Sequence, residues 1–155
     1  MYTSKTAPEQ IVDYYPITYD FKESNEYEVR ELVEEVREKI EYNWISCYTV
    51  DPLTNSLEKM DIDESGFNMI DVIQFQSGCG LSAWVAEQKR PILLSSVHRG
   101  QRFHSNPVKS FVCCPIIRNG ETIGVINLGH IQNQAYNKKI LNQLLGILNP
   151  AESNE

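Results

Sequence analysis

The sequence contains no apolar run that approaches the roughly 20 residues needed to cross a bilayer. Its first eight residues lack the apolar core of a secretion signal. Basic residues are scarce, because 14 Lys and Arg stand against 21 Asp and Glu, which gives a net charge of −7. No basic stripe offsets this excess locally, so direct nucleic-acid binding is not expected. These absences predict a cytoplasmic protein that contacts neither membrane nor nucleic acid.

Cysteine and histidine are also few, with four and three residues respectively. Without an export signal the thiols are expected to be reduced. Cys113 and Cys114 are adjacent in a predicted strand, so they point to opposite faces and cannot hold one metal. We expect both to be small residues of the core. His98 and His104 lack carboxylate ligands at metal-binding spacing, and His130 is expected at the surface. No metal site and no cofactor is predicted.

The length of 155 residues fits one domain. Residues 1–22 mix proline, tyrosine and polar residues without periodicity, which predicts an irregular lead-in. From Asn25, a plausible N-cap, apolar residues recur at helical spacing as far as Ile40. We therefore place a single domain over 23–150, followed by a polar tail over 151–155.

Further elements follow from β-branched and aromatic runs, helical periodicity and turn residues. The stretch 95–109 is polar and longer than most connections, as functional lids often are. The predicted elements are strands over 44–50, 56–62, 67–75 and 91–94, a short helix over 81–88, two strands over 111–117 and 122–128, and a last helix from about 137 to 148.

The clearest local signal is Asn119-Gly120 between two apolar strands, because a type I′ turn needs positive φ at both positions. The two strands must then be antiparallel neighbours, and their apolar faces predict cover on both sides of the sheet. Counting outward without a bulge pairs Pro115 with Gly124. In that register Phe111 and Asn127 fall on opposite faces, so the face that would line a pocket is left open.

From residue 44 to residue 148 the chain resembles the GAF family. The likeness lies in the order and spacing of several blocks, which are residues 78–85, 90–94, 110–117, 119–120 and 122–128. It implies an α+β fold related to PAS domains, with a central antiparallel sheet of five to six strands. The N- and C-terminal helices would cover one face, and the short helix with the long loop would cover the other.

The resemblance implies a pocket on the face away from the terminal helices. Residues 78–83 also fit a G-x-G-x-x-A dinucleotide fingerprint, but the helix is short and no βα units repeat. We instead expect a tight turn whose helix N–H groups face the pocket. The predicted ligand-binding residues are Cys79, Trp84, Arg102, Phe103, His104, Ser105, Phe111 and Asn127.

Asn127 is the lone polar side chain in an apolar strand, so either a ligand or other protein groups must satisfy its buried amide. The likeness extends to one enzymatic branch, the free methionine-(R)-sulfoxide reductases. At constant spacing, however, His104 stands at the place of the catalytic thiol, and Phe111, Asn127 and Gly129 stand at those of the substrate-binding carboxylates. Without an attacking thiolate, sulfoxide reduction is not expected, and no catalytic residue is predicted.

The resemblance therefore implies a regulatory domain that binds a small molecule and signals through its terminal helices, which would pair in a homodimer. Such domains usually belong to a larger signalling protein or act on a partner. Two alternatives stay open. One is a ligand-free dimerisation module, and the other is an enzyme of the reductase type.

Overall fold

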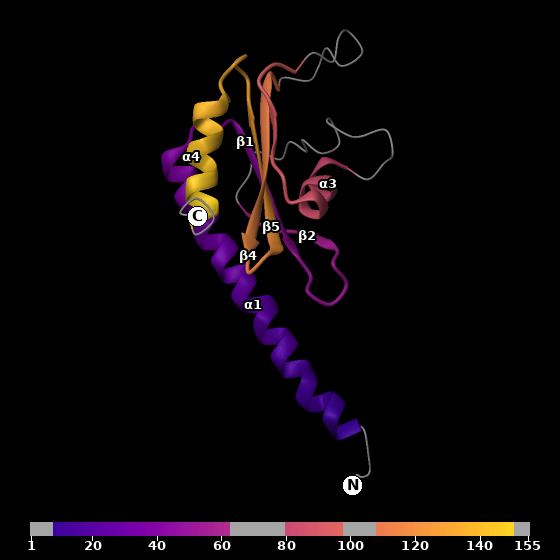
Figure 1. Ribbon diagram of the computed structural model, residues 1–155. Coiled ribbons are helices and arrows are strands. Elements are labelled where there is room, and N and C mark those ends of the chain that lie inside the picture. The colour runs from indigo at the N-terminus through magenta and orange to yellow at the C-terminus, as the bar shows by residue number, and fades with distance from the viewer. Residues whose placement is uncertain (1–7, 63–79, 98–107, 151–155) are drawn as a thin grey trace.

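The computed structural model describes residues 8–62, 80–97 and 108–150, with side chains described from Lys22 onward. Five antiparallel strands form one sheet in the order β2-β1-β5-β4-β3. Helices α1 and α4 lie on one face and α3 on the other (Figure 1). The elements are α1 (Pro8–Lys39), β1 (Trp44–Val50), β2 (Leu57–Lys59), α3 (Leu81–Gln88), β3 (Ile92–Leu94), β4 (Ser110–Arg118), β5 (Glu121–His130) and α4 (Lys138–Leu148).

This arrangement confirms the predicted α+β architecture, and the bounds of β1 and α3 agree with the sequence-based ones. The strand predicted over 56–62 is shorter, since β2 has three residues. The strand predicted over 67–75 and the tail over 151–155 lie outside the described residues. Within the described ranges, no helix combines the length and the hydropathy needed to span a membrane.

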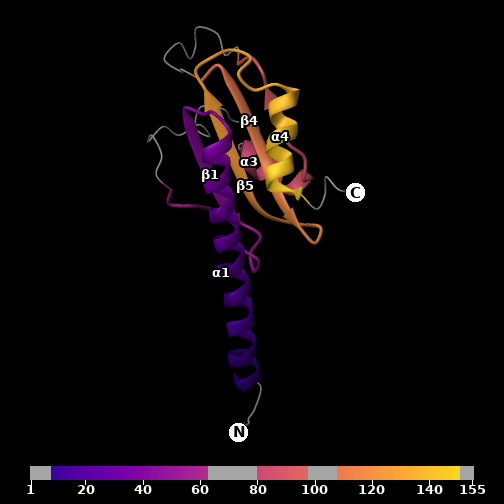
Figure 2. The ribbon, with the colours of Figure 1, turned by 90° about the vertical axis from the view of Figure 1, so that its left-hand side faces the viewer.

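Helix α1 is longer than the sequence suggested. It begins at Pro8, so the prediction of an irregular lead-in was wrong over residues 8–22, and so was the predicted helix start at Asn25. Residues 1–7 of the predicted lead-in lie outside the described residues. The C-terminal half carries the predicted apolar stripe, in which Val29, Val33 and Val36 are fully buried against the sheet and α4. A helix stabilised by packing at one end can extend beyond that stripe, because each further turn only propagates it. Figure 2 shows α1 running well past the sheet.

A second, smaller core lies beneath α3. Leu81 and Val85 of this helix pack on Phe111, Cys113 and Val125 of the sheet, all of them buried. Helix α3 opens at Gly80, whose φ of 77° is in the region that favours glycine. The sheet is thus covered on both faces, as the apolar character of β4 and β5 predicted.

The β4–β5 turn has the predicted conformation, with φ of 54° at Asn119 and 78° at Gly120. The register beyond it differs from the prediction. A bulge at Ile123 shifts the ladder by one residue, so Gly124 lies opposite Ile116. The predicted pairing of Gly124 with Pro115 was therefore wrong, because it assumed an uninterrupted ladder.

The bulge also decides which residues share a face. Asn127 now lies opposite Cys113, and alternation along β4 puts Phe111 on the same side of the sheet as Cys113. Phe111 and Asn127 thus both face α3, and their expected separation onto opposite faces was wrong. Cys113 and Cys114 are both fully buried, as predicted. His130 is buried rather than at the surface, because β5 continues to this residue and pairs it with Ser110.

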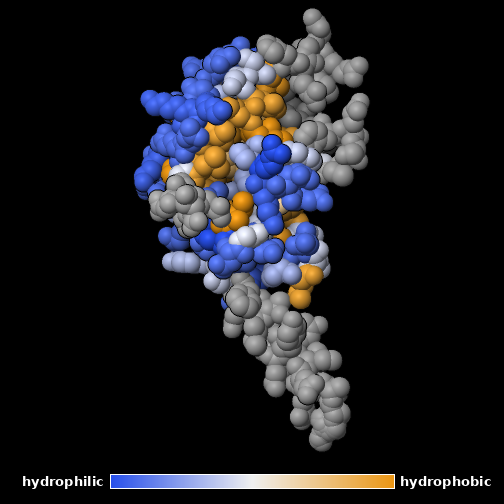
Figure 3. All heavy atoms as spheres, viewed as in Figure 1, coloured by the Kyte–Doolittle hydropathy of each residue, from blue (hydrophilic) through white to orange (hydrophobic). Residues whose placement is uncertain are grey.

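Among the described strands, β3 and the second half of β4 form one edge of the sheet. Figure 3 shows apolar residues along this edge, between α4 and α3, and the three residues of β3 are half-buried. Strand β3 pairs with β4 only as far as Cys113. Beyond that point the side chain of Asn149 takes the place of a strand, since its Nδ2 donates to Pro115 O (3.0 Å) and its Oδ1 accepts from Ile117 N (2.8 Å).

Replacing Asn149 by alanine is expected to lower the free energy of unfolding by about 2–3 kcal/mol. The buried Asn149 side chain is the hydrogen-bond partner of Pro115 O and of Ile117 N, and both backbone groups lose that partner in the variant. Urea denaturation measures the change. Asn142→Ala on the exposed face of α4 is the matched control, with an expected change below about 0.5 kcal/mol. Equal losses in the two variants would contradict the role of Asn149 as a strand substitute.

Candidate functional site

A cleft of about 650 Å³ opens between α3 and the ends of two hairpins. The β1–β2 hairpin supplies Tyr48, Val50 and Ser56, and α3 supplies Ala83 and Ala86. The start of β5 closes the third side with Glu121 and Thr122. The volume lies in the range of small-molecule sites, and the lining mixes apolar with polar groups. The cleft is on the α3 side of the sheet, opposite α1 and α4.

The N-terminus of α3 borders this cleft through Gly80, Ser82 and Ala83. No side chain caps the helix start, and the first N–H groups of any helix have no acceptor within the helix. Charged side chains also line the cleft. Glu87 and Lys89 stand at the C-terminal end of α3, and Glu121 stands at the β4–β5 turn. The lining can therefore pair both with the acceptors and with the donors of a polar ligand.

A buried polar cluster fixes α3 over the sheet. Ser46, Asn127 and Cys113 lie side by side on β1, β5 and β4. The Asn127 amide nitrogen donates to Ser46 Oγ (3.3 Å) and to Ser82 Oγ (3.0 Å), and the Ser82 hydroxyl is also 3.3 Å from Asn127 Oδ1. Since Ser82 lines the cleft as well, the cluster links the cleft to the centre of the sheet.

The described cysteines have little nucleophilic character. Burial raises the pKa of the Cys47 thiol to about 12 and raises the pKa values of Cys113 and Cys114 further above their usual range. Each is therefore a neutral thiol at physiological pH, and only the thiolate attacks. No group of three or more potential metal ligands occurs in the described part of the chain.

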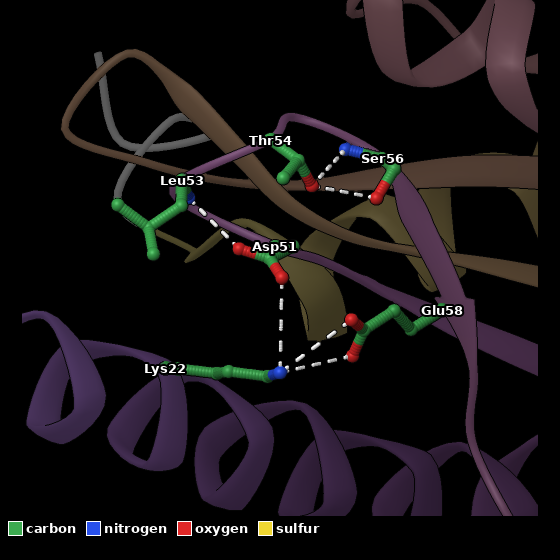
Figure 4. A network of polar contacts seen from close by, with 6 residues as sticks. All are labelled: Lys22, Asp51, Leu53, Thr54, Ser56 and Glu58. Atoms are coloured by element: carbon green, nitrogen blue, oxygen red, sulfur yellow. Dashed lines mark hydrogen bonds and ion pairs between the residues drawn. The ribbon is translucent and has the colours of Figure 1, made fainter.

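The opposite side of the β1–β2 hairpin is held by α1. Lys22 Nζ lies 3.4 Å from both carboxylate oxygens of Glu58 and 3.7 Å from Asp51 Oδ2 (Figure 4). The hydrogen bond to Glu58 raises the pKa of Lys22. The backbone N–H of Leu53 donates to Asp51 (2.8 Å), which lowers the pKa of that carboxyl. The turn between the two strands is thereby ordered and tied to α1.

The end of the β4–β5 hairpin is held in a similar way. The Arg118 guanidinium donates to the Glu28 carboxylate on α1 and to Leu148 O at the C-terminus of α4 (2.9 Å). On the other side of the same hairpin, Thr122 Oγ1 donates to Ala86 O of α3 (2.8 Å). The β1–β2 hairpin thus contacts α1, and the β4–β5 hairpin contacts both terminal helices.

Three of the eight predicted site residues can be placed. Phe111 is buried in the core beneath α3, Trp84 packs half-buried against that core, and Asn127 is satisfied by two serines. None of these three lines the cleft. The other five, which are Cys79, Arg102, Phe103, His104 and Ser105, lie outside the described residues. The expectation that the start of α3 faces a pocket agrees with Gly80 and Ser82 in the cleft lining.

Sequence reasoning missed the hairpin residues of the cleft, among them Tyr48, Ser56 and Thr122. The sequence predicts strands over 44–50 and 56–62, which flank the first turn, and it predicts the Asn119-Gly120 turn itself. Neither segment indicates that the two turns border one cleft next to α3, because their proximity depends on the sheet order β2-β1-β5-β4. The residues of these two segments do not specify that strand order.

An antiparallel sheet with terminal helices on one face and a ligand-sized cleft beside a short helix on the other defines an α+β domain of the GAF type. The GAF domain family matches the chain over residues 28–153, and the chain belongs to this family. A search of curated proteins by sequence finds no significant match.

Solved structures share the fold at low sequence identity. The type II free methionine-R-sulfoxide reductase of Thermoplasma acidophilum is 18% identical, with a TM-score of 0.57 over 83% of this chain and 90% of the other. The GAF domain of a two-component sensor histidine kinase from Bacillus halodurans is 15% identical, with a TM-score of 0.54 over 77% and 85%. NreA of Staphylococcus aureus, mutated in its nitrate binding site, is 14% identical, with a TM-score of 0.52 over 76% and 94%.

Proposed function

We propose that this chain is a regulatory domain that binds a small molecule in the cleft beside α3 and transmits occupancy through α1 and α4. The observation that carries the proposal is the position of the cleft. It borders α3 and two hairpins. The β1–β2 hairpin is bonded to α1, and the β4–β5 hairpin is bonded to both α1 and α4. A ligand can bias the helices only if it binds one arrangement of these elements better than another.

Two further observations support a sensor rather than a catalyst. The three described cysteines are buried and neutral, so they offer no nucleophile. NreA, which shares the fold, has a nitrate binding site, and the related histidine kinase domain belongs to a sensor protein. The ligand expected here is a small polar molecule with an apolar part, because alanine and valine alternate with charged groups in the lining.

Native mass spectrometry of the purified full chain tests the proposal. We expect a bound small molecule in the wild-type protein and its loss in Ala83→Trp, which fills the cleft from α3. Asn133→Trp on an exposed loop is the matched control and should retain the ligand. The proposal fails if the wild type carries no ligand and no metabolite raises its Tm. Turnover of free methionine (R)-sulfoxide with thioredoxin would overturn the non-catalytic assignment.

A ligand-free dimerisation module is the second candidate, favoured by one observation. Tyr27 on α1 is 68% exposed and is the most exposed of the three large hydrophobic side chains found at the surface of the described residues. If α1 pairs between two copies, Tyr27→Glu should raise the dimer dissociation constant about tenfold or more, measured by light scattering. Leu53→Glu, at a residue that is 61% exposed on the β1–β2 turn, is the matched control and should leave it unchanged.

A further inference from the structure

The route from the cleft to α1 passes through two charged contacts. On one side, Lys22 of α1 contacts Asp51 and Glu58, which stand at either end of the β1–β2 turn. The residues between them include Asn55 and Ser56, which line the cleft. Figure 4 shows the lysine beneath the turn, with both carboxylates directed at its ammonium group. A displacement of this cleft wall therefore changes the surroundings of Lys22.

On the other side, Glu28 of α1 contacts Arg118 at the end of β4. Arg118 lies opposite Glu121 in the β4–β5 ladder, and Glu121 and its neighbour Thr122 line the cleft. The same guanidinium bonds Leu148 O of α4. A displacement of this second wall therefore acts on both terminal helices at once.

Helix α1 holds the two contacts at a fixed spacing. Lys22 and Glu28 are six residues apart on one helix, so about 9 Å of rigid helix separates their backbones. Next to Glu28, α1 packs tightly on the sheet, because a Cβ added at Gly124 would lie 3.0 Å from Val29 Cγ2. If the two cleft walls move apart, the spacing on α1 cannot follow. The displacement then falls on the two side-chain contacts and strains the weaker of them.

We propose that α1 responds to occupancy of the cleft through these two anchors, Lys22 on the β1–β2 hairpin and Glu28 with Arg118 on the β4–β5 hairpin. The inference rests on the proposed function, since it names how occupancy of that same cleft reaches the terminal helices. The anchors suit this role because ion pairs with partly exposed side chains are individually weak. A ligand that prefers the wider cleft can therefore release one of them, which frees the N-terminal half of α1.

Hydrogen–deuterium exchange of the full chain tests the inference without knowledge of the ligand. Ala83→Trp, or Ala86→Trp where the first does not fold, occupies the cleft with a side chain. We expect the amides of residues 22–28 to exchange about fivefold faster in the filled variant than in the wild type. The comparison is repeated in the Lys22→Met, Arg118→Met background, in which both anchors are absent. There the filling side chain should change the exchange rates no further.

Lys39→Met is the matched control, because the ion pair of Lys39 with Glu35 (2.9 Å) lies within α1 and spans no hairpin. In that background the fivefold effect of filling should persist. The inference is overturned if filling leaves exchange over 22–28 unchanged, or if it raises exchange by the same factor without the anchors. The tryptophan stands in for the ligand, so these outcomes are independent of the mass-spectrometric test of binding.

Discussion

Substitution of Asn127 by aspartate is expected to lower the free energy of unfolding by about 3 kcal/mol at pH 7. The side chain is fully buried, and its amide nitrogen donates to Ser46 and Ser82. The introduced carboxylate keeps the size of the amide but loses this donor and brings a charge into the core. Two serine hydroxyls can donate to it, and no cationic side chain among the described residues bonds this position. The hydroxyls cannot replace the lost hydration.

The destabilisation by Asn127→Asp should depend on pH. Burial raises the pKa of the introduced carboxyl in the folded state, whereas the unfolded chain keeps the ordinary value of about 3.9. Below the unfolded pKa both states are protonated, and the charge penalty is absent. As the pH rises through 3.9, the unfolded state releases its proton first, so stability is lost until the folded pKa is reached. The variant should therefore approach the wild type at acidic pH and diverge from it toward pH 7.

Urea denaturation of the two proteins at pH 4 and pH 7 measures this effect, with each variant compared with the wild type at the same pH. Asn133→Asp on an exposed loop is the control, and its change should stay within about 0.5 kcal/mol at both values. A loss for Asn127→Asp that is the same at pH 4 and pH 7 would show that charge burial is not its cause. That result would point to a packing defect at this position instead.

The sequence predicted most of the fold because the strongest local signals agreed with the tertiary structure. The Asn119-Gly120 turn, the apolar strands on both sides of it and the stripe of α1 each specify a feature that the structure shows. The bulge at Ile123 could not be predicted in the same way, because one extra residue in a ladder leaves no compositional mark. Yet this residue decides that Phe111 and Asn127 share a face.

The candidate site was harder to predict than the fold. Its polar residues come from the β1–β2 turn, from α3 and from the start of β5, which are brought together only by the order of the strands. The anchors show the same difficulty, since Arg118 and Glu28 are 90 positions apart in the chain. An arginine beside a hairpin turn is ordinarily a solvated residue. Its contacts with both terminal helices are visible only in three dimensions.

The second large effect is expected at Gly124, where Val29 of α1 packs directly on the sheet. A Cβ built here would lie 2.9 Å from Tyr48 O and 3.0 Å from Val29 Cγ2. The first contact is with the backbone of β1 and cannot be relieved by a change of rotamer. We therefore expect Gly124→Ala to lower the free energy of unfolding by about 3 kcal/mol, at the upper end for overpacking by one methyl group.

The two close contacts at Gly124 can be separated by a second substitution. Val29→Ala removes the side-chain contact and leaves the backbone contact, so the double variant should be about 1 kcal/mol more stable than the sum of the single effects predicts. Gly146→Ala is the matched control. A Cβ at that position of α4 meets nothing within 4 Å, and helix propensity should raise stability by about 0.5–1 kcal/mol. Strict additivity of Gly124→Ala and Val29→Ala would mean that α1 does not rest on β5 at this glycine. The rigid spacing between the two anchors would then lose its structural basis.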